Sequence, residues 1–98
     1  MDHFLYRNGV LHAEDVAIPE LAAAVGTPFY VYSTATLTRH FALFQEALAG
    51  MPHTICFAMK SLSNVAVLKL LAGLGAGMDV VSIGEYLRAR SMTASMEA

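Results

Sequence analysis

The apolar residues of this chain first form short runs typical of strands and then recur with helical spacing. Residues 4–7 and 10–12 are apolar runs on either side of Asn8-Gly9, the strongest short-range signal for a β-hairpin. Pro19 suits a first helical turn and Gly26 a helix end, which predicts a helix over residues 18–25. Residues 29–32 are aromatic and β-branched and predict another strand.

From Thr36 onward the pattern predicts alternating helices and strands. A helix capped by Ser33, Thr34 or Thr36 would bury one apolar stripe, made of Leu37, Phe41, Phe44 and Leu48. Gly50 and Pro52 would stop this helix. There follow a strand at 54–60, a helix at 65–74, a strand at 77–82 and a helix from Ser82 or Gly84 to Arg90. This order is typical of parallel βαβ units, and the pattern is lost over residues 91–98.

Composition excludes several classes of protein. The chain has 98 residues, of which 56% are hydrophobic and 14% charged, the opposite balance from a disordered segment. Its net charge of −2 includes no basic cluster, so we expect no nucleic-acid partner. No apolar stretch is long enough to span a membrane. The only cysteine is Cys56, which fits a reducing cytoplasm, and the high hydrophobicity suits part of a larger protein.

Lys60 is the strongest candidate for chemistry. It closes the apolar run 54–60, where burial would be costly for an ammonium group. Desolvation lowers the pKa of an amine and frees its lone pair for attack on a carbonyl, as in Schiff-base lysines. The structural alternative is a lysine that extends from the strand end to solvent. Alternation places Cys56, Ala58 and Lys60 on one face of this strand.

Other candidates favour structural roles. Cys56 has no adjacent base and is expected to be a structural thiol. The four histidines show no metal-ligand spacing and do not predict a metal site; they are His3, His12, His40 and His53. The glycines at 73, 75 and 77 precede a strand, so they predict a helix end and a turn, not a phosphate loop.

Three segments together resemble the start of a diaminopimelate decarboxylase. They are Val31-Tyr32-Ser33, Phe57-Ala58-Met59-Lys60 with Asn64, and the run from Gly75 to Glu85. The resemblance covers residues 4–90. It implies membership of the pyridoxal-phosphate decarboxylases with an alanine-racemase-like barrel.

What the resemblance implies is a covalent cofactor site. Lys60 would form the Schiff base with pyridoxal 5′-phosphate, and Ala58 would lie against the cofactor ring. Asp79 would be a charged neighbour of the lysine and cofactor, and Glu85 would lie at the rim of the pocket. A first-turn carboxylate such as Glu85 also has a simple structural role, because the helix dipole favours it. No metal is implied.

The implied fold is α/β: an incomplete (β/α)₈ TIM barrel of the alanine-racemase-like type, preceded by a short N-terminal β-hairpin. A whole barrel needs about 250 residues. The implied domains are N-terminal strands and a linker helix at 1–35, the first βα units of the cofactor-binding barrel at 36–90, and a divergent tail at 91–98. In full-length relatives the hairpin pairs with a C-terminal β-domain, and the proteins are homodimers. Ser61-Leu62 departs from the Ala-Asn that usually follows the lysine.

The implied reaction converts meso-diaminopimelate to L-lysine and carbon dioxide, with the isolated chain inactive. Related ornithine, arginine and carboxynorspermidine decarboxylases share this start and are alternatives. Another alanine-racemase-like pyridoxal-phosphate protein, which also uses a lysine on the first barrel strand, is a further alternative. A truncated product without activity is the non-enzymatic alternative. The expected partner is a small amino-acid substrate.

Overall fold

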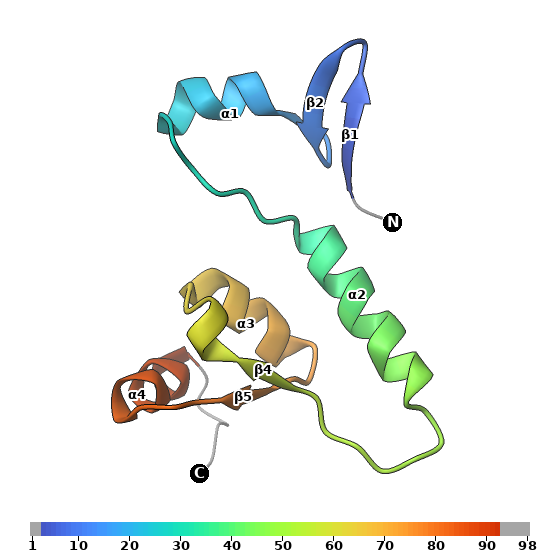
Figure 1. Ribbon diagram of the computed structural model, residues 1–98, viewed down its shortest axis with the longest axis vertical. Coiled ribbons are helices and arrows are strands. Elements are labelled where there is room, and N and C mark those ends of the chain that lie inside the picture. Colours follow the sequence, from blue (N-terminus) through green and yellow to red (C-terminus); the bar gives the residue numbers. More distant parts are fainter. Residues whose placement is uncertain (1–2, 93–98) are drawn as a thin grey trace. The chain divides into compact units, whose positions relative to one another are not determined.

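A computed structural model describes residues 3–92 (Figure 1). The chain divides into two compact units, Met1–His40 and Phe41–Ala98, which are described separately below. The N-terminal elements are β1 (Phe4–Arg7), β2 (Val10–Ala13), β3 (Val16–Ala17) and α1 (Ile18–Val25). Helix α2 (Thr34–Ala47) crosses the division, and it is followed by β4 (Cys56–Ala58), the 3₁₀ turn η1 (Met59–Ser61), α3 (Val65–Gly73), β5 (Gly77–Asp79) and α4 (Ile83–Met92).

The N-terminal unit contains the predicted hairpin. Strands β1 and β2 pair antiparallel, with Phe4 opposite Ala13 and Arg7 opposite Val10. Asn8 and Gly9 both have positive φ, 51° and 78°, as a type I′ turn requires. The sequence analysis missed β3, a two-residue strand that pairs with β2 and completes a sheet of order β1-β2-β3.

The predicted helix at 18–25 is confirmed, with Pro19 in its first turn and Gly26 at its C-cap. The predicted strand at 29–32 is wrong, because this segment pairs with no strand among residues 3–92. The alternation behind the prediction is nevertheless present. Phe29 and Val31 are half-buried, whereas Tyr30 and Tyr32 are exposed. A strand needs a hydrogen-bonded neighbour as well as an alternating face.

Helix α2 begins where its cap predicts. The Ser33 hydroxyl accepts a hydrogen bond from the Thr36 N–H at 3.1 Å, so Ser33 is the capping residue among the three candidates. The predicted stripe of this helix is not a buried core in this chain. Phe44 is 54% exposed, and the other three members, Leu37, Phe41 and Leu48, are only half-buried.

The C-terminal unit contains the predicted alternation of strands and helices. Strands β4 and β5 pair in parallel, and α3 connects them (Figure 1). The Asn64 side chain caps α3 by accepting hydrogen bonds from the Ala66 and Val67 N–H groups at 2.9 and 3.3 Å. Both strands are shorter than predicted, since pairing extends only from Cys56 to Ala58 and from Gly77 to Asp79.

A small core holds this unit together. Met59, Leu68 and Ala89 are at most 1% exposed and come from η1, α3 and α4. Partly buried side chains pack around them, namely Phe57, Met78, Val80 and Met92. The core therefore joins one face of the parallel pair to both helices. Helix α3 buries Leu68 and Leu71, whereas Val65 is 39% exposed.

Gly77 has no room for a side chain beside Cys56. A Cβ at position 77 would lie 2.9 Å from the Cys56 Sγ, because the two residues are partners in the β4–β5 ladder. We expect Gly77→Ala to lower the free energy of unfolding by about 0.5–1.5 kcal/mol, because the exposed Cys56 side chain must leave its rotamer to make room. Chemical denaturation should find most of the loss recovered in the Cys56→Ala background.

Gly73→Ala is the matched control for this prediction, since a Cβ there would meet nothing within 4 Å. An equal loss for Gly77→Ala with and without the Cys56 thiol would show that overlap with sulfur is not the cause.

No helix within residues 3–92 is both long enough and apolar enough to cross a membrane.

Candidate functional site

The candidate site lies where β4 and β5 end. In the parallel register Ala58 is the partner of Asp79, so the carboxyl ends of both strands lie side by side. Lys60 follows Ala58 by two residues and sits in η1, a 3₁₀ turn. The expectation of a strand reaching Lys60 and burying it is wrong for this chain, because pairing stops at Ala58 and the lysine is exposed.

The strand face that leads to this site is lined by small groups. Partners in a parallel ladder share a face, so Cys56 lies beside Gly77 and Ala58 beside Asp79. On the opposite face, Phe57 and Met78 pack against the core. This face of β4 and β5 therefore carries small side chains, and the opposite face carries the large ones.

Both charged groups at this end are accessible. Lys60 and Asp79 are exposed, and among residues 3–92 neither side chain takes part in an ion pair or a hydrogen bond. The structure therefore brings Lys60, Ala58 and Asp79 to one end of the parallel pair. The Lys60 amine and the Asp79 carboxylate are therefore accessible to a ligand.

Glu85 is engaged in capping helix α4. Its carboxylate accepts a hydrogen bond from the Val81 N–H at 2.9 Å, and its own N–H donates to the Ser82 hydroxyl at 3.1 Å. This resembles a capping box, with the serine and the glutamate three residues apart, except that the glutamate binds the N–H of Val81, one residue before the capping serine. The first-turn structural role considered for Glu85 is therefore present in this chain, whereas its role at a pocket rim stays a prediction.

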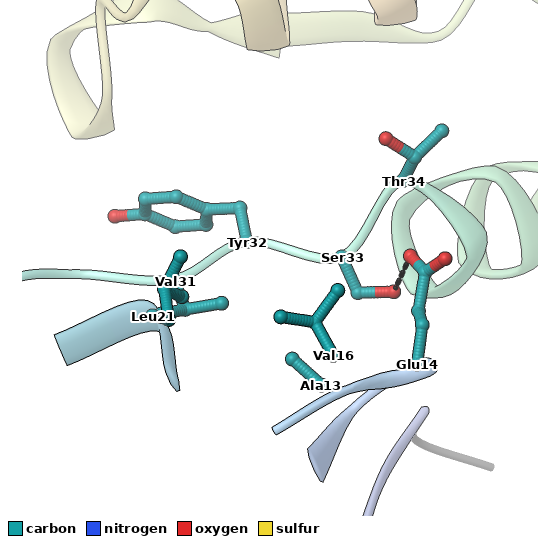
Figure 2. A pocket seen from close by; sticks show the side chains of 8 residues that line it. All are labelled: Ala13, Glu14, Val16, Leu21, Val31, Tyr32, Ser33 and Thr34. Atoms are coloured by element: carbon teal, nitrogen blue, oxygen red, sulfur yellow. Dashed lines mark hydrogen bonds between the residues drawn. The ribbon is translucent and has the colours of Figure 1, made fainter. Parts of the chain in front are cut away.

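A second polar cluster, in the N-terminal unit, escaped the sequence analysis. Glu14 accepts hydrogen bonds from the Ser33 hydroxyl at 2.6 Å and from the Ala35 N–H at 3.2 Å. Figure 2 shows Glu14 and Ser33 pointing toward each other. Both residues line a pocket of about 260 Å³. The apolar walls of this pocket include Val16, Leu21 and Val31. No local spacing links residues 14 and 33, so sequence patterns alone could not reveal the contact.

Glu14 gives the N-terminal unit a dependence on pH. The Ser33 hydroxyl and then the Ala35 N–H hold the pKa of Glu14 below its usual value of 4.5, because both hydrogen bonds favour the carboxylate. The stabilisation is therefore full above pH 4.5 and is lost as the pH falls through the lowered pKa. We expect acid to weaken the hydrogen bonds that the Glu14 carboxylate accepts from the Ser33 hydroxyl and the Ala35 N–H at the start of α2. Carboxyl chemical shifts of Glu14 and hydrogen exchange of the Ala35 amide should both report this.

Glu14→Gln should flatten that acid response. Glu46→Gln is the matched control, because Glu46 is an exposed carboxylate of α2 whose side chain makes no hydrogen bond within residues 3–92. Identical acid profiles of the Ala35 amide in the parent chain and in Glu14→Gln would contradict the assignment.

Comparison with known proteins identifies the family of this chain. The family described as "Pyridoxal-dependent decarboxylase, pyridoxal binding domain" matches residues 34–98, more than half of the chain. The chain belongs to the pyridoxal-dependent decarboxylases. The resemblance seen in the sequence is thereby confirmed.

Curated members of this family are similar over most of the chain. Diaminopimelate decarboxylase of Haemophilus influenzae is 51% identical over 88 residues, which cover 90% of this chain and 21% of that protein. The enzyme of the same name from Pseudomonas aeruginosa is 52% identical over the same share. The chain thus spans about a fifth of the length of these pyridoxal-dependent decarboxylases.

Solved structures share the fold of the chain. A diaminopimelate decarboxylase from M. jannaschii, in complex with L-lysine, superposes with a TM-score of 0.87 at 32% identity and covers 93% of this chain and 22% of its own. The protein AQ1208 from Aquifex aeolicus gives 0.85 at 40% identity. The α/β class predicted from sequence is confirmed for residues 3–92.

Proposed function

We propose that the chain is the N-terminal part of a decarboxylase that uses pyridoxal 5′-phosphate to convert meso-diaminopimelate to L-lysine and carbon dioxide. Lys60 is the residue that binds the cofactor covalently. The register of β4 and β5 is the observation that carries this proposal, because it brings the lysine turn and Asp79 to one open end of a parallel pair. Ligands of parallel α/β folds bind at the carboxyl ends of strands.

The residues present fit such a cofactor. The Lys60 amine is exposed and unpaired within the described residues, as attack on an aldehyde requires. Ala58, whose side chain is a single methyl group, ends β4 immediately before the turn that carries the lysine, so no bulky group at that position opposes a cofactor ring. When bound, pyridoxal phosphate supplies an electron sink for the carbanion left by decarboxylation.

Each site residue has a distinct task in this proposal. Lys60 would hold the cofactor covalently, and its amine would also transfer a proton during the reaction. Ala58 supports one face of the ring. Asp79 places a negative charge beside the lysine and cofactor, and Glu85 lines the rim of the pocket while capping α4.

The substrate rests on the relatives. Those described above are diaminopimelate decarboxylases, and one of them was solved with L-lysine, the product of this reaction. The wider family description names no substrate, so decarboxylases of ornithine or arginine are the alternative. Activity toward diaminopimelate and not toward these amino acids would distinguish the two.

The whole activity belongs to a longer protein in this proposal. Exposed apolar side chains, including Val81, Ile83 and Leu87 at 65%, 72% and 55%, are typical of surfaces covered by further protein. We assign residues 1–35 to the N-terminal strands and linker helix, 36–90 to the first βα units of the barrel and 91–98 to a divergent tail. A cytoplasmic homodimer is the assembly that we infer.

Reductive trapping tests the assignment of Lys60. The chain contains only two lysines, and Lys69 on α3 is also exposed, so it serves as an internal control. A complete protein that carries this chain is mixed with pyridoxal phosphate and reduced with borohydride, and peptide mass spectrometry then locates the adduct. We expect label on Lys60 in clear excess over Lys69. Equal labelling, or more label on Lys69, would overturn the proposal.

A further inference from the structure

The turn that carries Lys60 is closed by a side chain. The Ser61 hydroxyl donates a hydrogen bond of 2.7 Å to the Ala58 carbonyl, which is the last carbonyl of β4. The Leu62 N–H donates to the Met59 carbonyl at 3.1 Å across the same residues. Lys60 therefore lies at the centre of a turn that two hydrogen bonds close, one of them dependent on a hydroxyl.

Both sides of this turn are held in place. Met59 is 1% exposed and inserts into the core beside Leu68, which fixes the backbone just before the lysine. On the other side, Asn64 caps α3 through two backbone N–H groups. Between Met59 and Asn64, the one hydrogen bond from a side chain of the turn to the end of β4 is the bond from the Ser61 hydroxyl to the Ala58 carbonyl. Because Ser61 is itself exposed, its hydroxyl is not needed to fill the core.

We propose that Ser61 is a positioning residue for Lys60. Its hydroxyl sets the direction in which the Lys60 side chain leaves the turn and so presents the amine over the carboxyl ends of β4 and β5. Water competes for the Ala58 carbonyl when the hydroxyl is absent, and the turn then samples other geometries. This inference rests on the proposed function of Lys60.

Two matched pairs of variants isolate the hydroxyl. Ser61→Ala removes it, and Ser63→Ala is the control because Ser63 is exposed and its hydroxyl makes no hydrogen bond within residues 3–92. Ser61→Thr and Ser61→Val form the second pair, since they have nearly the same shape and only threonine carries a donor. Far-UV circular dichroism establishes whether each variant folds. If Ser61→Ala does not fold, the comparison of Ser61→Thr with Ser61→Val tests the role of the hydroxyl.

The readout is the ratio of borohydride-trapped label on Lys60 to that on Lys69 at limiting pyridoxal phosphate. In trapping, the amine condenses with the aldehyde and releases water, and borohydride then delivers hydride to the new C=N bond. We expect Ser61→Ala and Ser61→Val to lower the ratio by about twofold to tenfold, the effect of one net hydrogen bond. Ser61→Thr and Ser63→Ala should keep the ratio of the parent chain. Hydrogen exchange of the Leu62 amide should accelerate in the variants without a hydroxyl.

The outcomes separate this inference from the proposal that it rests on. If the parent chain prefers Lys60 and the variants without the hydroxyl keep the same ratio, Ser61 has no positioning role and the function of Lys60 stands. If the parent chain shows no preference for Lys60, the proposed function fails and the role of Ser61 fails with it. A lowered ratio in Ser61→Val with recovery in Ser61→Thr supports the inference, since a general loss of stability would not follow the hydroxyl.

Discussion

Lys60→Arg in a complete protein that carries this chain is expected to lower the rate of diaminopimelate decarboxylation by at least about 10²-fold. Arginine keeps the positive charge and much of the length, but its guanidinium does not lose a proton in proteins and so cannot attack an aldehyde. A positioned proton-transfer group alone contributes about 10²- to 10⁴-fold, and this lysine also holds the cofactor. Carbon dioxide release at saturating pyridoxal phosphate is the measurement.

Lys69→Arg is the control for this experiment, because Lys69 is exposed on α3 and has no task in the proposed site. It should retain nearly full activity. The isolated 98-residue chain should release no carbon dioxide, since it spans about a fifth of the length of its relatives. Near-normal turnover by Lys60→Arg would remove the lysine from the mechanism, and turnover by the isolated chain would refute its incompleteness.

Local signals predicted most of the secondary structure. The Asn8-Gly9 turn and the Ile18–Val25 helix depend on residues adjacent in sequence, and both were predicted with the bounds that the structure has. Gly26 illustrates why: its φ of 82° is a backbone state that glycine adopts without cost, so a glycine there ends a helix whatever surrounds it.

Tertiary context accounts for the errors. The Phe29–Tyr32 segment has the alternation of a strand, but the described chain offers it no partner. The same reasoning applies to the lysine. Its position at the end of an apolar run is visible in the sequence, whereas its burial depends on groups that cover the turn, and none of the described residues does so.

The candidate site was predictable in part. Strand alternation predicted Ala58 and Lys60 on one face, but the strand ends at Ala58 and Lys60 lies in the η1 turn that follows. The parallel register places Asp79 beside Ala58, a link that only the resemblance had suggested. The capping role of Glu85 could have been identified from the Ser-x-x-Glu spacing, a known helix-start signature. The contact between Glu14 and Ser33 could not be predicted, because it joins two separate segments of the chain. It also depends on the backbone at Glu14, where φ is 55°.

Leu68→Ala is expected to cost about 2–5 kcal/mol of the free energy of unfolding, the range for removing a fully buried leucine side chain. Leu68 is 0% exposed and lies at the centre of the core formed with Met59 and Ala89. Natural domains have only about 5–15 kcal/mol in total, so this single change should remove a large share of it. Urea denaturation followed by circular dichroism measures the loss.

The matched control is Leu87→Ala, the same chemical change at a residue that is 55% exposed on α4. It should cost less than about 0.5 kcal/mol, as surface substitutions do. The comparison also bears on the site, because Met59 packs against Leu68 and immediately precedes the lysine. A cavity at Leu68 would loosen that anchor, so trapping at Lys60 should fall together with stability. Equal losses for the two leucine variants would mean that the core is not centred on Leu68.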